Sequence, residues 1–199
     1  GTSQSPPMIN RLIVLSALII AFALTISWFL DESDEEMDFT PRNEPDLYML
    51  NATISQFGTE GGLQHRITAN RFTHFPLTDV TTMKLPALGL RGTRGSDSWE
   101  ITSSEGRILP SSYYREEIVE LWSDVLALQS GTGSEFVTIE TNSLTVYPER
   151  GYAETDEPVF IKNQSGRTTA AAMKAFLNTG KFMFYSTPEH RVTTIFLPD

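Results

Sequence analysis

Three histidines and one pair of adjacent acids are the residues whose types could support metal binding or acid–base catalysis. His65, His74 and His190 form neither an HExxH motif nor an i, i+4 pair, and the chain has no G-x-S-x-G element or phosphate-binding glycine loop. Asp156 and Glu157 are neighbours before a proline, and neighbouring strand residues point to opposite faces, so a turn explains them better than a paired-acid site. The sequence therefore predicts no catalytic residue, metal or cofactor.

Apolar side chains are the more informative group. Aromatic residues form 11% of the 199-residue chain and lie mostly in short segments that resemble strands. Such side chains could fill a closed core, or some could line an open groove that binds an apolar ligand. Sequence periodicity does not separate these two interpretations.

The charge distribution excludes some partners. The chain carries a net charge of −10 and has no cysteine, so disulfides and cysteine metal sites are excluded. All 25 acidic residues, but also 14 of the 15 basic ones, follow Leu30, which leaves that part near −11. This balance argues against binding to nucleic acid or to an anionic membrane surface.

An apolar segment near the N-terminus has the length of a membrane span. Residues 12–30 carry no charge, and a helix of this length is roughly 28 Å long, close to the hydrocarbon thickness of a bilayer. A cleaved signal peptide is the alternative, but its apolar region is usually shorter and followed by small residues. We therefore expect a transmembrane helix over 12–30.

The residues around this span suggest its orientation and its surroundings. Residues 1–7 look like a leftover of an expression vector, and 8–11, with Arg11, form a short tail expected to stay in the cytoplasm. Residues 31–45 are rich in acids and proline and are expected to be an extended linker. Small residues at four-residue spacing let another helix approach closely, although such residues are also common in lone anchors. They are Ala17, Ala21 and Thr25.

The remaining residues, 46–199, are expected to form one β domain. Short alternating segments punctuated by proline and glycine indicate an all-β sandwich or barrel. A pattern N-x-[F/L]-T-x-[F/Y]-P occurs at 70–76 and again at 142–148, which suggests repeated hairpin units. Two segments, 117–129 and 170–177, also fit a helix. The pattern alone favours a helix for the first, whereas the repeat and the surrounding strands favour sheet.

Several motifs, in order and spacing, resemble those of the LptC family, the bitopic component of the lipopolysaccharide export bridge of Gram-negative bacteria. The resemblance covers the chain from Met8 onward. It rests on the tail, span and linker, on Tyr48, and on the segments 57–63, 66–69, 73–75, 99–101, 119–122, 124–125 and 153–159.

The resemblance implies an all-β fold, an open β-jellyroll of two stacked antiparallel sheets whose interior holds the acyl chains of lipopolysaccharide, and it decides both ambiguous segments for strand. It places the span in the bacterial inner membrane and the domain in the periplasm. The edge at 47–57 would pair with the transporter subunits LptF and LptG, and the edge at 181–197 with LptA. The span would pack among transporter helices and modulate ATP use by LptB.

The resemblance carries over to few individual residues. Gly61 matches a turn glycine, and a second glycine of some members is not evident, because Asn163 lies near its place. Two alternatives are a scaffold that joins transporter and LptA without holding lipid, and a tethered hydrolase, for which the sequence offers no nucleophile or acid pair. Alternation alone proposes the side chains that line the groove, which are Leu50, Ile54, Ile67, Met83, Ile139, Val146, Ile161, Phe182 and Phe184.

Overall fold

The computed structural model describes residues 22, 42–91, 98–130 and 136–196. The chain divides into two compact units, Gly1–Arg42 and Asn43–Asp199, and the described strands all belong to the second. The expected span over 12–30, including Ala17, Ala21 and Thr25, lies outside the described residues except for Phe22. Among the residues that are described, no helix has the length and apolar character needed to cross a membrane.

The second unit is built from antiparallel strands, which confirms the all-β expectation. Both ambiguous segments are strands, because β7 covers most of 117–129 and β12 lies within 170–177. The described elements are β1 (Leu47–Phe57), β2 (Leu63–Phe75), β3 (Val80–Lys84), β4 (Ala87–Arg91), β5 (Ser98–Thr102), β6 (Glu105–Leu109), β7 (Ile118–Ser130), β8 (Phe136–Tyr147), the 3-10 turn η1 (Pro148–Arg150), β9 (Tyr152–Thr155), β10 (Val159–Asn163), β11 (Gly166–Ala170), β12 (Ala172–Phe176), β13 (Lys181–Tyr185) and β14 (Thr193–Phe196).

The pairing register shows that these strands form two layers that share their long members. In β2, residues 65–68 pair with β4, whereas 71–75 pair with β3. In β7, the first half pairs with β6 and the second half with β5. We call the layer with β3, β6, β9, β12 and β13 the β3 sheet, and the layer with β4, β5, β10, β11 and β14 the β4 sheet. The strands β1, β2, β7 and β8 run through both.

The long strands bend where they pass from one sheet to the other. Asn51 has a φ of 47°, and Ser123 and Asp124 have φ of 63° and 58°, values that place these residues in the left-handed region. The tight connections β3–β4 and β5–β6 lie along the same line. We call this line the seam. We call the side of the sandwich opposite to the seam, where the two sheets end in loops, the mouth.

Apolar side chains from both sheets fill the space between them. The alternation of strand residues turns one face of each sheet inward, and many inward side chains are almost completely buried. The most deeply buried come from both layers and include Ile67, Phe72, Leu88, Ile101, Val119, Leu121, Val146 and Ala175.

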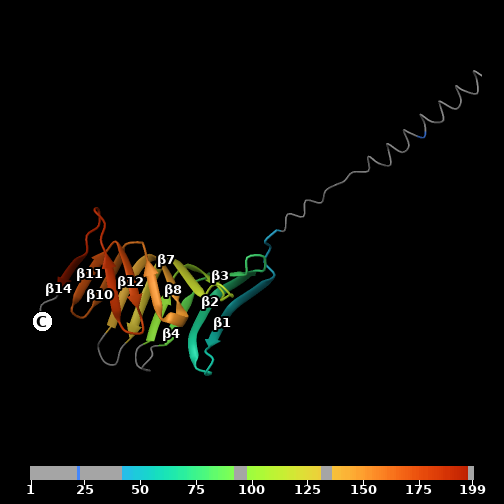
Figure 1. Cartoon of the computed structure of the whole chain (residues 1–199), viewed down its shortest axis with the longest axis horizontal. Helices are drawn as coiled ribbons and strands as arrows, with labels where there is room; N and C mark the ends of the chain where they lie inside the picture. Colours follow the sequence, from blue (N-terminus) through green and yellow to red (C-terminus); the bar gives the residue numbers. More distant parts are fainter. Residues whose placement is uncertain (1–21, 23–41, 92–97, 131–135, 197–199) are drawn as a thin grey trace, which may run out of the picture. The chain divides into compact units, whose positions relative to one another are not determined.

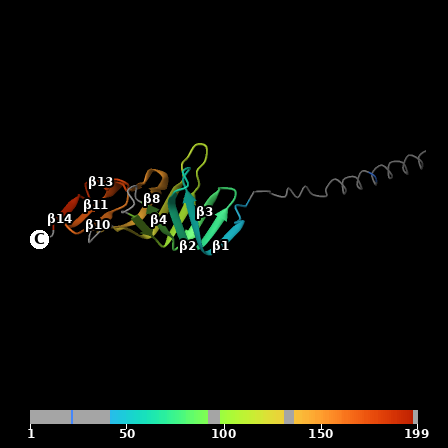
Figure 2. The ribbon, with the colours of Figure 1, turned by 90° about the horizontal axis from the view of Figure 1, so that it is seen from below.

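The sandwich ends in strands that lack a partner on their outer edge among the described residues. At one end, β1 pairs only with β2 along ten matched positions. At the other, β13 pairs only with β12 and β14 only with β11. Figures 1 and 2 show β1 and β14 at opposite ends of this unit.

Candidate apolar trough and strand edges

Most of the side chains proposed to line a groove point into the space between the sheets, which we call the trough. Ile67, Met83, Ile139, Val146 and Ile161 are each less than a tenth exposed. Ile54, Phe182 and Phe184 are half-buried and pack against the same cluster. Their contact with a lipid stays a prediction, since burial is also what a plain core requires.

Leu50 does not share this interior, and its proposed inward position is wrong. It is 63% exposed on the outer face of β1, whereas Met49, Ala52 and Ile54 are the half-buried apolar residues of this strand. The left-handed backbone at Asn51 shifts the alternation by one residue, so Leu50 and Ile54 face opposite sides despite their even spacing.

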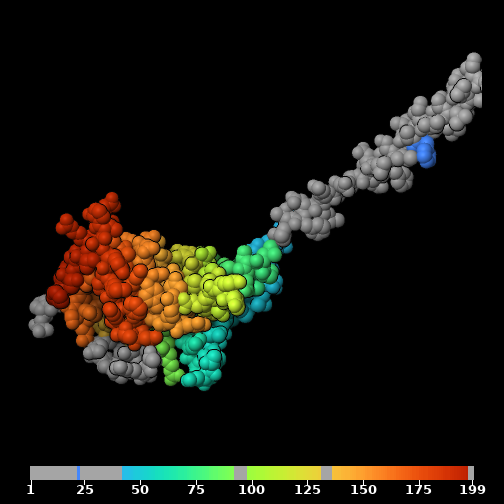
Figure 3. Space-filling view, in the orientation of Figure 1, coloured from blue at the N-terminus to red at the C-terminus, as the bar shows by residue number. Residues whose placement is uncertain are grey.

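The trough is filled in its middle and more accessible at its two ends. Leu88, Ile101, Val119 and Leu121 in the middle are no more than 1% exposed. Most of the half-buried apolar residues that pack against this core lie at the ends, with Met49, Ala52 and Ile54 on β1 and with Phe182 and Phe184 on β13. The parallel rings of Phe182 and Phe184 lie 6.3 Å apart. Figure 3 shows the C-terminal strands, in orange and red, at one of these ends.

The mouth of the trough is bridged by contacts that sequence analysis missed. His65 Nε2 on β2 lies 2.8 Å from Glu117 Oε1, just before β7. The indole nitrogen of Trp99 on β5 donates to the carbonyl oxygen of Leu177 at 3.4 Å. One available signal was overlooked: His65 precedes Ile67 and Ala69 at even spacing, which places a polar side chain on an inward face.

The free strand edges carry exposed apolar side chains. Exposed apolar residues on such edges favour pairing with another chain. Leu47, Tyr48, Leu50 and Phe57 on β1 are between 49% and 63% exposed, and Ile195 and Phe196 on β14 are 49% and 76% exposed.

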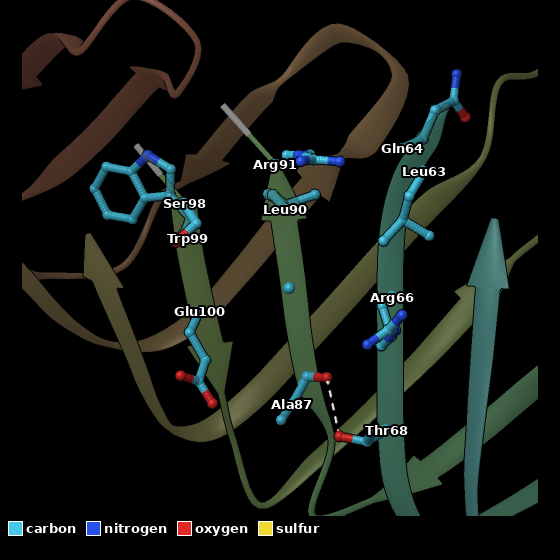
Figure 4. A pocket seen from close by; sticks show the side chains of 11 residues that line it. Leu63, Gln64, Arg66, Thr68, Ala87, Leu90, Arg91, Ser98, Trp99 and Glu100 are labelled. Carbon is cyan, nitrogen blue, oxygen red and sulfur yellow. Dashed lines mark hydrogen bonds between the residues drawn. The ribbon is translucent and has the colours of Figure 1, made fainter. Parts of the chain in front are cut away.

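A separate hollow of about 420 Å³ lies on the outer face of the β4 sheet. Side chains of Arg66, Arg91 and Glu100, on three neighbouring strands, surround it (Figure 4), and Gly89 also lines it. Its groups are spread over an open surface and do not form a nucleophile, an acid–base pair or a ligand set.

Several titratable groups outside the trough take part in local hydrogen bonds. Asp46 and Asp79 accept hydrogen bonds from His74 Nδ1 and Nε2 at 2.8 and 3.3 Å, and these bonds, that to Asp46 first, raise the pKa of His74. Burial, followed by a hydrogen bond to Glu154, raises the pKa of Tyr152. Beside Asp156, the backbone N–H of Glu157 donates to the Thr155 hydroxyl at 3.0 Å, which is a turn.

Two glycines occupy positions that other residues would strain. Gly61, in the β1–β2 turn, has a φ of 77° and its N–H donates to the Gly58 carbonyl, which agrees with its expected place in a turn. Gly166 has a φ of 155° and lies so close to β14 that a Cβ would stand 2.1 Å from the Ile195 carbonyl oxygen. Gly166 closely follows the strand that begins after Pro158. The sequence analysis expected a second glycine near this place and found only Asn163 there.

Comparisons with known proteins agree with this architecture. Residues 15–189 match the family model LptC, described as "Lipopolysaccharide-assembly, LptC-related". Among solved structures, LptH of Pseudomonas aeruginosa, the LptA-homologous periplasmic component of its lipopolysaccharide transport device, superposes with a TM-score of 0.53 at 9% identity. The match covers 67% of this chain and 95% of LptH, and at this identity it shows the fold alone. No curated protein sequence matches the chain significantly.

Proposed function

This chain belongs to the LptC-related family of lipopolysaccharide-assembly proteins, and from that premise we propose that it receives lipopolysaccharide at its β1 end and passes it on at its β13–β14 end. Family and fold give it a role in lipopolysaccharide transport at the inner membrane and periplasm. The finer steps below are our proposal.

One observation carries the proposal: each end of the trough combines half-buried apolar residues with a free strand edge. At the β1 end, Ile54 lies on β1, whose outer edge is free. At the other end, Phe182 and Phe184 lie on β13, whose outer edge is also free. A neighbouring jellyroll that adds a strand to such an edge would continue both the sheet and the apolar interior.

The donor and the acceptor follow from the family. The β1 edge would pair with the jellyroll of the LptF and LptG subunits of the ABC transporter, and the opposite edge with LptA. Residues 12–30 would anchor the chain in the membrane, where Ala17, Ala21 and Thr25 would pack against transporter helices and modulate ATP hydrolysis by LptB. None of these steps makes a bond, so the proposed role is non-catalytic.

The energy for holding the lipid would come from its acyl chains. The chain is acidic and lipopolysaccharide is anionic, so their net charges repel each other. Burial of each methylene contributes about 0.8 kcal/mol. A few buried methylenes therefore outweigh the attraction of an exposed ion pair, which rarely exceeds about 1 kcal/mol.

Site-specific photo-crosslinking tests this role. A photoreactive residue at position 184, on the inner face of β13, is expected to capture lipopolysaccharide in living cells. The same residue at 185 is the matched control, because the neighbouring side chain Tyr185 lies on the outer face and is 42% exposed. Equal labelling at both positions, or labelling at 185 alone, contradicts a lipid-carrying trough.

The filled middle of the trough favours a second candidate, a scaffold that joins transporter and LptA without holding lipid. The two roles differ in the response to a charge on the half-buried inner face. In a lipid carrier, Phe182→Glu is expected to block export while the melting temperature changes little. In a scaffold, export fails only in step with the loss of folded protein.

A further inference from the structure

His65 and Glu117 form a buried polar pair that joins the two sheets at the mouth. His65 continues the inward row of Ile67 on β2, where this strand belongs to the β4 sheet, and Glu117 continues the inward row of Val119 in the β3 sheet. Their side chains are 2% and 17% exposed, and Nε2 and Oε1 are 2.8 Å apart. Each lies at the mouth end of its strand, so their contact joins the two sheets at this point.

This closure is imperfect. Among the described atoms, His65 Nδ1 has no hydrogen-bond partner. Glu117 Oε1 has none either, since its close approach to Nε2 lacks hydrogen-bond geometry. Unsatisfied buried polar atoms cost free energy, and an apolar pair of similar size would often be at least as stable. A polar closure of this kind positions the sheets yet opens more easily than an apolar one.

The rest of the molecule is compatible with opening at the mouth. The second link between the sheets, from Trp99 to the Leu177 carbonyl, is a single hydrogen bond at the long end of the normal range, 3.4 Å. On the opposite side, the long strands already turn through left-handed residues at Asn51, Ser123 and Asp124. Such positions at bends are where small backbone rotations can be absorbed when two layers part.

We propose that His65 and Glu117 form a latch that holds the mouth closed and whose release lets the acyl chains of lipopolysaccharide enter between the sheets. This inference rests on the proposed lipid-carrying function, because the middle of the trough is filled while the mouth is closed. The two residues act as positioning residues that set the equilibrium between closed and open sheets, not as ligands of the lipid.

Spin-label distances in the full chain, solubilised in detergent, test the latch directly. The chain has no cysteine, so Arg66→Cys with Glu149→Cys gives one label on β2 and one on η1, across the mouth. Arg66→Cys with Lys162→Cys is the control, since β2 and β10 lie five strand positions apart within the β4 sheet, roughly 24 Å.

Three changes to the pair should affect the distance across the mouth in different ways. His65→Glu places two carboxylates together and is expected to lengthen it, while the control distance stays the same. The exchanged pair, His65→Glu with Glu117→His, is expected to restore it. His65→Leu with Glu117→Leu is expected to narrow the distribution around the closed distance, because an apolar pair closes more firmly.

Lipid capture provides the second readout, with purified lipopolysaccharide and the photo-crosslinker at position 184. We expect His65→Glu to speed capture several-fold and the double leucine variant to slow it several-fold. If His65→Glu fails to fold, Glu117→Gln must widen the mouth distribution instead.

An unchanged mouth distance in the folded variants, or failure of the exchanged pair to restore it, overturns the latch. Faster capture in the double leucine variant overturns it as well. If the wild-type chain captures no lipid while the mouth distance responds as expected, the lipid-carrying function fails and the closure itself stands.

Discussion

The two ends of the sandwich both leave strand edges free, but they are built differently. At the β1 end, one strand of 11 residues runs through both sheets, and it is paired with β2, itself 13 residues long. At the opposite end, two separate strands of five and four residues, β13 and β14, each extend only one sheet. All four residues of β14 are exposed. The β1 end is therefore an integral part of both sheets and offers a continuous edge for strand pairing. We expect β14, in contrast, to be able to separate from its sheet without unfolding the rest.

The same substitution at the two ends should show the largest difference. Phe72→Ala removes a side chain that is 1% exposed, between β1 and β3, and is expected to lower the free energy of unfolding by about 3–5 kcal/mol. Phe196→Ala removes one that is 76% exposed on β14 and should change it by no more than about 0.5 kcal/mol. Urea unfolding followed by tryptophan fluorescence measures both. Equal losses would show that β14 is part of the core.

Gly166→Ala should detach β14 and leave the rest folded. Its Cβ would stand 2.1 Å from the Ile195 carbonyl oxygen, so β14 must move away and its amides should lose protection from hydrogen exchange. Gly61→Ala is the matched control, because Gly61 also has a positive φ but no atom lies within 4 Å of the added Cβ. That variant should lose only about 1–2 kcal/mol of backbone energy. If the β14 amides of Gly166→Ala kept their protection from hydrogen exchange, the expectation that β14 separates on its own would be contradicted.

The smallest expected effect is a pH dependence confined to the β1 end. His74 joins Asp46, next to β1, to Asp79, and these hydrogen bonds raise its pKa above the ordinary 6.5. A group with a raised folded pKa stabilises fully below its unfolded pKa, and this contribution disappears as pH rises through the folded pKa.

The wild-type chain should therefore lose stability relative to His74→Gln as pH rises through and above 6.5, the ordinary pKa of histidine. Melting temperatures of both proteins across this range measure the difference, and the other two histidines are common to both. A difference that is constant with pH would mean that His74 contributes packing and not charge.

Sequence patterns predicted the class of the fold and most inward positions because the alternation of inward and outward side chains depends only on the local strand. The alternation of Ile67, Ile139 and Ile161 needs no knowledge of partners. It failed at Leu50 because one left-handed residue, Asn51, reverses the phase. Asn adopts this conformation more readily than most residues, but its presence alone does not identify a bend within a strand. The helical spacing in 117–129 has a similar origin, since Ser123 and Asp124 shift the phase inside β7.

Alternation could place His65 on an inward face, but it could not identify its partner across the mouth. His65 and Glu117 lie far apart in the sequence, and only the pairing of β2 with β4 and of β7 with β6 brings their ends together. Gly166 was missed for the same reason: its importance depends on the backbone of β14, which reaches it only through a long-range pairing.

The long strands that belong to both layers also protect the chain against misfolding. A slip of one residue between β7 and β8 would turn Val119 and Leu121 of one layer outward, and with them Val125 and Ala127 of the other. A register error in one layer therefore exposes apolar side chains in both layers. Because the long strands continue through the bends near Ser123 and Asp124, the register of one layer fixes that of the other, and the two layers assemble cooperatively.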